Sequence, residues 1–229
     1  MAKLAIIDLE TTAIRPDEGS IIEIAVILYS VKHSSELAAV STLIPTELNQ
    51  AKSINHIDEL ATQEAVDILD AGLSFAKDLI NSADYVVAHN AAFEKAWLPW
   101  IKKPWLCTFE DFIWPKNTNK QKTSLIETAV NHGVPVISAH RALDDCRLIS
   151  SLLSSLSLEE RIRIVDDAIS RSNEQKVIVI AHVSYDDREL AKTNGFTWNN
   201  KSAPKAWSKL LRPSEIENWN FHWTIKNDF

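Results

Sequence analysis

Three apolar runs near the N-terminus constrain the fold of this chain more than any other feature of the sequence. The runs are rich in Ile, Val, Leu and Ala and cover residues 4–9, 21–29 and 37–44, with a polar loop at 11–20 and a polar turn at 32–35 between them. Apolar runs of this length between turn signals are typical of β-strands. Because the last connection is short, we predict that the runs form a meander.

Beyond the meander, helical and strand patterns alternate. The elements that we expect there are helices over residues 59–81, 91–101, 124–132 and 139–156 and short buried strands at 85–88 and 105–107. Asn90 stands where its side chain could cap the helix that follows it. A meander continued by alternating helices and strands predicts an α/β fold with a central mixed β-sheet flanked by helices.

The composition changes after the last of these helices. Residues 157–173 are polar and charged, after which Val177 begins an apolar strand, residues 187–193 have a helical pattern and a Trp-rich tail follows. We therefore predict two domains, residues 1–173 and 174–229, of which the second is a small α+β module. Its four tryptophans could form a miniature core or a platform on which bases stack. The module could also mediate dimerisation or substrate choice.

Scarce glycine and cysteine exclude several classes of site. The chain has four glycines, none within six positions of another, which excludes the G-x-G-x-x-G and P-loop phosphate cradles. Two cysteines without a C-x-x-C pair argue against a disulfide framework or a cysteine zinc site, so we expect a reducing, cytoplasmic location. The longest apolar run is far shorter than the ~20 residues that cross a bilayer. We expect neither a signal peptide nor a membrane partner.

Two carboxylates lie on the first predicted strand. Asp8 and Glu10 are two positions apart, so both side chains project from one face of the strand. Carboxylates flanked by apolar residues repel each other and lose hydration unless a cation neutralises them, and hard oxygen donors suit Mg²⁺ or Mn²⁺. The alternative is that this face of an edge strand is solvated, and the spacing alone leaves both possibilities open.

A second group of polar residues lies in the segment H-N-A-A-F-E-K-A-W. Phe93, Trp97 and Trp100 share one apolar face of the predicted helix, and Glu94 lies at the edge of that face. By itself, this pattern is typical of a surface glutamate. Taken alone, His89 would be a hydrogen-bonded core histidine or a partner at the end of the strand.

The third group lies in H-R-A-L-D-D-C-R-L-I. Asp145 lies about 40° from the centre of the apolar face of the predicted helix, whereas Asp144 lies about 140° away. A carboxylate against an apolar face needs a partner, whereas Asp144 could form a solvated ion pair with Arg141. His140 lies at the start of the helix, where its imidazole could act as a general base.

Together, D-L-E-T-T, H-N-A-A-F-E and H-R-A-L-D-D-C resemble, in this order, the three motifs of the DnaQ-like (DEDDh) 3′-5′ exonucleases. The likeness covers residues 3 to about 156, and the segment L-P-W-I-K-K-P-W-L-C-T is similar to the exonuclease X type of the family. The resemblance implies an RNase H-like fold. It also implies that Asp8, Glu10 and Asp145 bind metal, that Glu94 is the fourth carboxylate and that His140 is the general base.

One position departs from the family pattern. The family has aspartate where this chain has Glu94, whose side chain is one methylene longer, so the activity or the metal preference could be altered. Aspartate and glutamate are both hard oxygen donors, and we therefore expect an active enzyme.

The same resemblance implies a substrate and a mechanism. Two Mg²⁺ or Mn²⁺ ions would support hydrolysis of phosphodiester bonds at the 3′ ends of DNA, single-stranded or frayed, with release of nucleoside 5′-monophosphates. Six residues are implied to contact the terminal nucleotide: Leu9, Thr11, Thr12, His56, Asn90 and Phe93.

The net charge of −7 is unusual for a protein that binds nucleic acid, but bound cations would supply positive charge at the site. Two alternatives stay open. One is an RNA-trimming exoribonuclease of the same family, and the other is a catalytically weak nucleic-acid-binding or polymerase-associated subunit. A homodimer is also compatible with the sequence.

Overall fold

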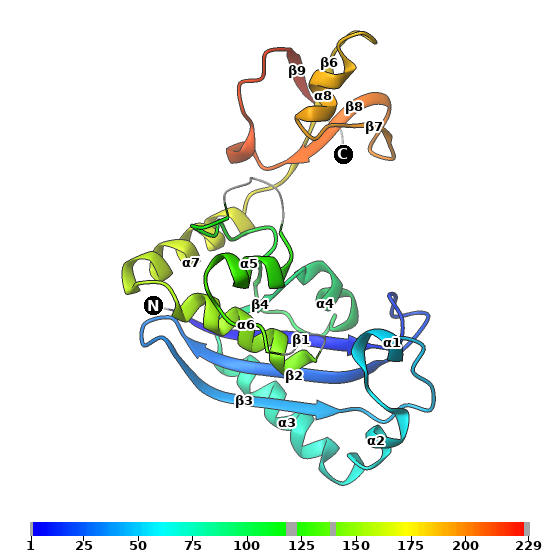
Figure 1. Cartoon of the computed structure of the whole chain (residues 1–229), viewed down its shortest axis with the longest axis vertical. Helices are drawn as coiled ribbons and strands as arrows, with labels where there is room; N and C mark the ends of the chain where they lie inside the picture. Colours follow the sequence, from blue (N-terminus) through cyan, green and yellow to red (C-terminus); the bar gives the residue numbers. More distant parts are fainter. Residues whose placement is uncertain (1, 118–122, 138–140, 227–229) are drawn as a thin grey trace. The chain divides into compact units, whose positions relative to one another are not determined.

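The computed structural model describes residues 2–117, 123–137 and 141–226. The chain divides into two compact units, Met1–Ser172 and Asn173–Phe229 (Figure 1). All the predicted carboxylate positions lie in the first unit, and the Trp-rich tail lies in the second. The predicted division into domains 1–173 and 174–229 stays a prediction, which a truncated chain can test.

A five-stranded mixed sheet forms the centre of the first unit. Its strands are β1 (Lys3–Thr11), β2 (Ile21–Ser30), β3 (Ser35–Leu43), β4 (Tyr85–Ala88) and β5 (Trp105–Cys107), in the spatial order β3-β2-β1-β4-β5. β1, β2 and β3 pair in antiparallel fashion, whereas β4 runs parallel to β1 and β5 runs parallel to β4. The predicted meander and the mixed sheet are confirmed.

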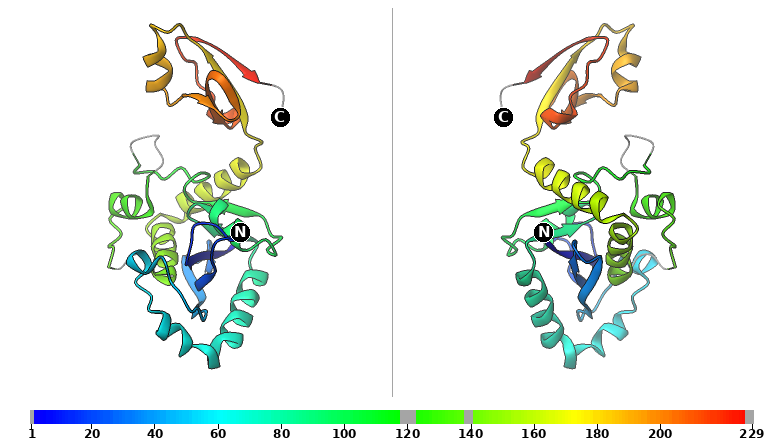
Figure 2. Two further views of the ribbon diagram at one scale, coloured as in Figure 1. Left: turned by 90° about the vertical axis from the view of Figure 1, so that its right-hand side faces the viewer. Right: turned by 90° about the vertical axis from the view of Figure 1, so that its left-hand side faces the viewer.

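Helices flank this sheet on both faces. They are α1 (Lys52–Asn55), α2 (Glu59–Gln63), α3 (Val66–Ser82), α4 (Ala91–Trp97), α5 (Leu125–Asn131), α6 (Ala142–Ser154) and α7 (Leu158–Ser172). Leu4 and Ile6 of β1 pack in a core with α5, α6 and α7, whereas Ala5 and Ile7 pack in a second core with α3 and α4. Figure 2 shows α3 and α6 on opposite sides of the blue strands. Burial on both faces explains why β1 and β2 are apolar along nearly their whole length.

The predicted helix over 59–81 is interrupted and forms both α2 and α3. At the end of α2, the hydroxyl of Thr62 donates to the carbonyl oxygen of Glu59 and accepts from the backbone N–H of Thr46. Side-chain hydrogen bonds of this kind compete with the helical backbone pattern. The chain therefore turns before α3 begins.

The predicted helix over 91–101 ends early, at Trp97. A proline at position 99 disfavours the helical conformation of Leu98 before it, and Leu98 has φ −120° and ψ 55°. The predicted cap is wrong, because Asn90 has φ 71° and forms no side-chain capping hydrogen bond. The helix predicted over 139–156 is α6, and the start expected at 139 lies outside the described residues.

The segment expected only to be polar and charged contains the helix α7. Arg161, Ile164, Val165 and Ala168 are buried on one face of it, at the i, i+3, i+4 and i+7 spacing of an amphipathic helix. The Arg161 guanidinium donates to the carbonyl oxygens of Val31, Leu153 and Leu156. Among the helices of the described ranges, none has both the length and the apolar character that a membrane span requires.

The second unit is a small α+β module, as predicted. It contains β6 (Val177–His182), α8 (Arg188–Thr193), β7 (Thr197–Asn200), β8 (Ala203–Leu211), a short 3₁₀ helix (Pro213–Glu215) and β9 (His222–Lys226). The strands form an antiparallel sheet in the order β7-β8-β6-β9. Trp207, Trp219 and Trp223 pack against its small core, whereas Trp198 is 55% exposed.

Candidate active site

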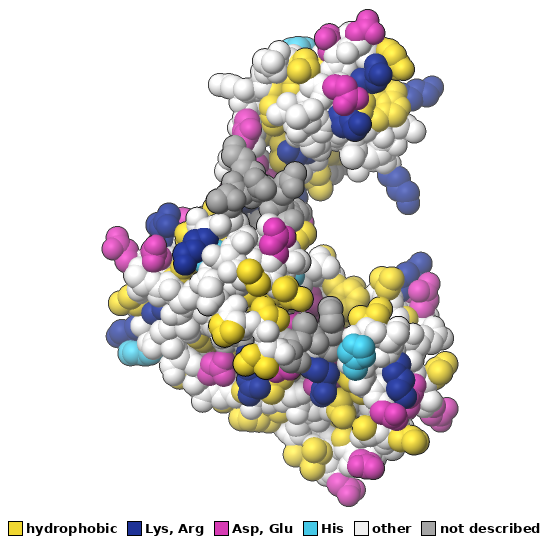
Figure 3. Space-filling model, viewed as in Figure 1, with side chains coloured by type: hydrophobic (Ala, Val, Ile, Leu, Met, Phe, Trp, Pro, Cys, Tyr) yellow, Lys and Arg dark blue, Asp and Glu magenta, His cyan; other side chains and the backbone are white. Residues whose placement is uncertain are grey.

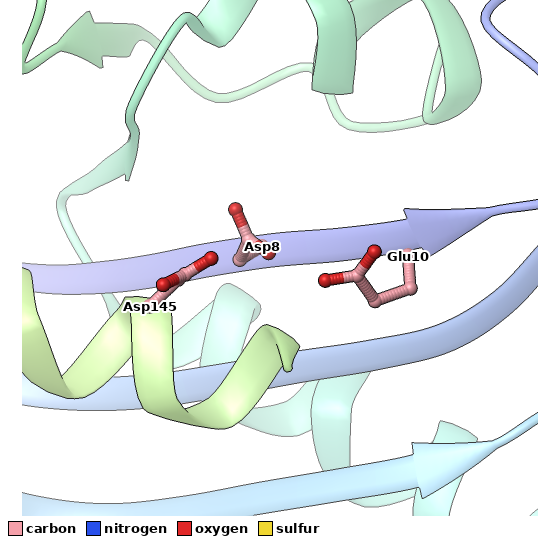
Figure 4. A group of neighbouring side chains, drawn as sticks. All are labelled: Asp8, Glu10 and Asp145. Carbon is pink, nitrogen blue, oxygen red and sulfur yellow. The ribbon is translucent and has the colours of Figure 1, made fainter. Parts of the chain in front are cut away.

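Three half-buried carboxylates converge between β1 and α6. Asp8 and Glu10 lie on β1 and Asp145 lies in the first turn of α6, and one carboxylate oxygen of each lies within 4.8 Å of those of the other two (Figure 4). Asp8 and Glu10 extend the row of Leu4 and Ile6 that faces α6, because alternate residues of a strand share a face. The structure thus brings together three of the five residues expected to be catalytic, whose roles stay predictions.

The packing of α6 determines which of its two aspartates reaches β1. Cys146 is fully buried, with its Sγ 3.6 Å from the carbonyl oxygen of Ile6 and 3.7 Å from that of Ala25. These contacts hold the helix against the first two strands and leave Asp145 beside the carboxylates of β1. Asp144 is also half-buried but is not part of the cluster, and its Oδ1 is 3.8 Å from Nη1 of Arg147.

Repulsion and burial dominate the electrostatics of this cluster. The pKa of Asp8 is raised well above its ordinary value by burial first and then by the charges of neighbouring carboxylates, beginning with Glu94 and Asp145. Burial, with Asp145 and Glu23, raises the pKa of Glu10 to about 7, although Arg141 opposes the shift. Burial and repulsion therefore favour the protonated forms of Asp8 and Glu10, and a bound cation would oppose both shifts.

Glu94 is buried, in contrast to the surface position that its pattern alone suggests. It lies on the inner face of α4 with Ala91 and Trp97, while Trp100 lies beyond the end of the helix and is 45% exposed. Burial raises the pKa of Glu94 to about 8. Its Oε2 has no hydrogen-bond partner among the described residues. The charge of Glu94 contributes to the raised pKa of Asp8. Glu94 is nevertheless not one of the three carboxylates that lie within 4.8 Å of one another.

A divalent cation fits this set of donors. Carboxylate oxygens are the ligands that Mg²⁺ and Mn²⁺ prefer. A cation would relieve the repulsion that raises the pKa of Asp8 and Glu10. The residues close enough to one another to share it are Asp8, Glu10 and Asp145, and a contribution from Glu94 stays a prediction.

The structure adds a buried residue that the motifs do not contain. Glu23 of β2 pairs in register with Glu10 and is 1% exposed. Its carboxylate accepts from Nε and Nη2 of Arg141 at 2.9 and 3.1 Å, from the backbone N–H of Ala142 at 3.3 Å and from Oγ of Ser41 at 2.7 Å. This pair joins the start of α6 to β2.

The Glu23–Arg141 pair replaces the ion pair that we expected between Arg141 and Asp144. Position 23 is a lone charge within an otherwise apolar run that forms a buried strand. A charge at such a position needs a buried partner. The need of Glu23 for a buried partner is the sequence signal that could have predicted its pairing with a distant residue such as Arg141.

The two histidines of the motifs differ in what the structure shows. His140 lies outside the described residues, although Arg141 after it is described and bonded to Glu23. His89 is half-buried, its Nδ1 lies 2.9 Å from Oγ1 of Thr108, and burial lowers its pKa to about 4. His89 is therefore a neutral, hydrogen-bonded residue of the strand end.

Three of the six residues expected to contact the nucleotide lie at the end of β1. Leu9 is buried on the face opposite the carboxylates, in the core with α3 and α4. Thr11 and Thr12 are also buried, and their hydroxyls serve the loop that follows: Thr11 donates to the carbonyl oxygen of Ala13, and Thr12 accepts from the backbone N–H of Ser20. Contact with a nucleotide through these residues stays a prediction.

The other three lie on neighbouring elements. His56 is exposed, and Asn55 before it donates to the carbonyl oxygen of Thr11, which brings α1 to the same end of β1. Asn90 is exposed at the start of α4. Phe93 is half-buried, with its ring centroid 6.1 Å from that of Trp97.

The fold and the arrangement of motifs agree with a known family. Residues 5–153, more than half of the chain, match the family model described as Exonuclease. The chain belongs to this family of DEDDh-type exonucleases. Residues 177–223 match a domain of unknown function. None of the curated proteins matches the sequence.

Solved structures support the RNase H-like fold. Exonuclease X in complex with 5′ overhanging duplex DNA is 24% identical with a TM-score of 0.52, over 72% of this chain and 99% of that chain. The nuclease domain of the DEDDh family member 3′hExo, bound to rAMP, is 18% identical with a TM-score of 0.53, over 72% and 92%. An exonuclease I from Methylocaldum szegediense is 14% identical with a TM-score of 0.56, over 93% and 63%.

Proposed function

We propose that the protein is a metal-dependent 3′-5′ exonuclease that hydrolyses phosphodiester bonds at single-stranded or frayed 3′ ends of DNA and releases nucleoside 5′-monophosphates. The observation that carries this proposal is the cluster of Asp8, Glu10 and Asp145, in which burial and repulsion raise the pKa of two carboxylates. The buried, unpartnered oxygen of Glu94 lies in the same neighbourhood.

The chain's own residues have distinct roles in this proposal. Asp8, Glu10 and Asp145 hold two Mg²⁺ or Mn²⁺ ions, with Glu94 as the fourth carboxylate. When bound, such ions activate water and stabilise the leaving oxygen of a phosphodiester. His140 accepts the proton of the attacking water as general base.

In this proposal, the Glu23–Arg141 pair helps to position the general base by fixing the residue that follows it in the sequence. Arg141 directly follows His140 and is bonded through two nitrogens to a carboxylate that is 1% exposed. An arginine fork on a carboxylate fixes geometry better than a single contact does. The pair therefore limits the motion of the backbone next to His140.

The leading alternative is an exoribonuclease of the same family. It is favoured by the similar fold of 3′hExo, whose structure contains rAMP, whereas the likeness to exonuclease X with duplex DNA favours DNA. A catalytically weak subunit, for instance one associated with a polymerase, is the other alternative. The cytoplasmic location and a homodimer are further proposals that rest on the sequence.

The decisive experiment uses oligonucleotides labelled at the 5′ end. Single-stranded DNA, duplex DNA with a frayed 3′ end and RNA of the same sequence are incubated with Mg²⁺, Mn²⁺ or EDTA. We expect a ladder that shortens from the 3′ end of DNA with either metal and no products in EDTA. A ladder on RNA alone would select the exoribonuclease, and no cleavage of any substrate would reject both enzymes.

A further inference from the structure

The C-terminal unit has one tryptophan that its core does not enclose. Trp198 of β7 lies directly opposite Trp207 of β8, with ring centroids 5.8 Å apart and planes at 56°. Trp207 packs against the core of the unit, whereas Trp198 is 55% exposed. The inner ring thus supports the outer one, which presents an aromatic surface to solvent.

The Trp198 side chain stands where the hairpin bends sharply. Asn199 and Lys205 both have positive φ, 55° and 58°, and Oδ1 of Asn199 accepts from the backbone N–H of Lys205 at 2.9 Å. Asn200 donates to the hydroxyl of Ser208, so the tip of the hairpin folds back on its own strand. The bend is hydrogen-bonded and holds the backbone next to the exposed ring.

The hairpin is basic in an acidic protein. Residues 197–211 contain Lys201, Lys205 and Lys209 and no Asp or Glu, although the whole chain has a net charge of −7. Nζ of Lys226 donates to the carbonyl oxygen of Ser202, which brings a fourth ammonium group to the tip. In Figure 3, basic, hydrophobic and acidic side chains are interspersed on the drawn face of the C-terminal unit.

We propose that this hairpin, residues 197–211, is a binding site for single-stranded nucleic acid. A base stacks on the exposed face of Trp198 while the lysines contact phosphates, the combination that single-strand binders use. A duplex keeps its base faces inside the stack, and an apolar protein partner would not explain a run of lysines without acids. The site is separate from the carboxylate cluster and needs no hydrolysis, although the strand it binds is of the kind that the proposed activity consumes.

The experiment measures binding by the full chain in EDTA, so that no substrate is cut. The probe is a fluorescently labelled oligothymidylate of about 20 nucleotides, followed by anisotropy. Trp198→Ala should weaken binding about 10-fold or more, since loss of one base–aromatic contact costs a factor of this order. Trp198→Phe should retain most of the affinity.

A lysine variant tests the electrostatic part. Lys201→Ala combined with Lys205→Ala should weaken binding and reduce the dependence of log Kd on log salt by about 1.4, since each single-strand phosphate contact contributes about 0.7. Lys192→Ala, on α8 beside Glu189, is the matched control and should change neither quantity.

A second control is Tyr185→Ala. Tyr185 is 78% exposed in the same unit, but its ring contacts Arg188 and the acids Asp186, Asp187 and Glu189 follow it in the sequence. We expect wild-type binding for this variant. Equal affinities for wild-type and Trp198→Ala protein, with unchanged melting temperatures, would overturn the proposal, and so would equal affinity for a blunt duplex. If the wild-type protein bound the oligothymidylate but cleaved no substrate with Mg²⁺ or Mn²⁺, only the proposed function would be refuted.

Discussion

Two buried glutamates in the first unit face opposite situations. Glu23 on β2 has bonds to Arg141, to Ser41 and to the backbone N–H of Ala142. Glu94 on α4 has a buried Oε2 without a hydrogen-bond partner in the described part of the chain. A buried carboxylate that is bonded to a guanidinium and to hydrogen-bond donors can stabilise the fold. A buried carboxylate without such partners has a charged form that the protein alone does not stabilise. The difference predicts a structural role for Glu23 and a cation-binding role for Glu94.

The largest effect should come from the carboxylates around the proposed ions. Asp145→Asn should lower the rate of 3′-end cleavage by more than about a hundredfold, because loss of a direct ligand exceeds the 10- to 100-fold cost of losing its hydrogen-bonded support. Asp144→Asn is the matched control, one residue away and outside the cluster, and should remain active. If Asp144→Asn were the inactive variant, the assignment of the helix face would be wrong.

Substitutions of Glu94 test its cation-binding role and should change the activity less than Asp145→Asn does. Glu94→Gln keeps the length of the side chain but removes its charge, so activity should fall by about 10- to 100-fold and more Mg²⁺ should be needed. Glu94→Asp should stay within about tenfold of the wild type, or about 1.4 kcal/mol of barrier. Equal, wild-type rates for both variants across a Mg²⁺ titration would show that Glu94 does not serve the site.

The free energy of unfolding should fall on substitution of Glu23 but not on substitution of Glu94. Glu23→Gln removes the charge that Arg141 pairs with and should cost about 1–3 kcal/mol of unfolding free energy, less than the loss of a fully buried pair because Arg141 is half-exposed. Glu94→Gln should cost nothing in EDTA, because it removes an unpaired buried carboxylate. Thermal melts in EDTA compare the two, and a larger loss for Glu94→Gln would break the comparison.

The pH dependence of stability should reveal the raised pKa of Glu94 and Glu10. Folding raises the pKa of Glu94 to about 8 and of Glu10 to about 7 from ordinary values near 4.5. The folded state therefore binds these protons more tightly, and metal-free stability should fall between about pH 5 and pH 8, by at most about 1.4 kcal/mol per pH unit for each proton. Glu94→Gln should flatten this slope in urea titrations, and Mg²⁺ should do so as well. A slope that Glu94→Gln leaves unchanged would contradict the raised pKa.

Local patterns in the sequence predict the elements that local forces determine. The meander, the short parallel strands and the positions of Asp8, Glu10 and Asp145 on facing surfaces follow from the period of a strand and of a helix. These local patterns did not predict contacts between segments that are far apart in the sequence. Glu23 and Arg141 are 118 residues apart, and only the register of β1 with β2 and the packing of α6 bring them together.

The burial of Glu94 also depends on packing that no single segment determines. A glutamate beside an apolar face is typical of a helix surface. In the structure, α4 ends at Trp97, so Ala91, Glu94 and Trp97 form its inner face. A helix of this length has no further turns that could shift the inner face toward Trp100.

The smallest effect should come from removing the second unit. Glu23, Glu94 and the cluster of Asp8, Glu10 and Asp145 all lie within Met1–Ser172. A chain ending at Ser172 should therefore fold and cleave a short oligonucleotide within about threefold of the wild-type rate, or about 0.65 kcal/mol. The sheet and the cores on its two faces consist of residues before this point. Longer single strands should bind more weakly, because the Trp198 hairpin is lost with the unit. Circular dichroism and the cleavage assay on both lengths check this, and an unfolded truncated chain would show that the two units depend on each other for stability.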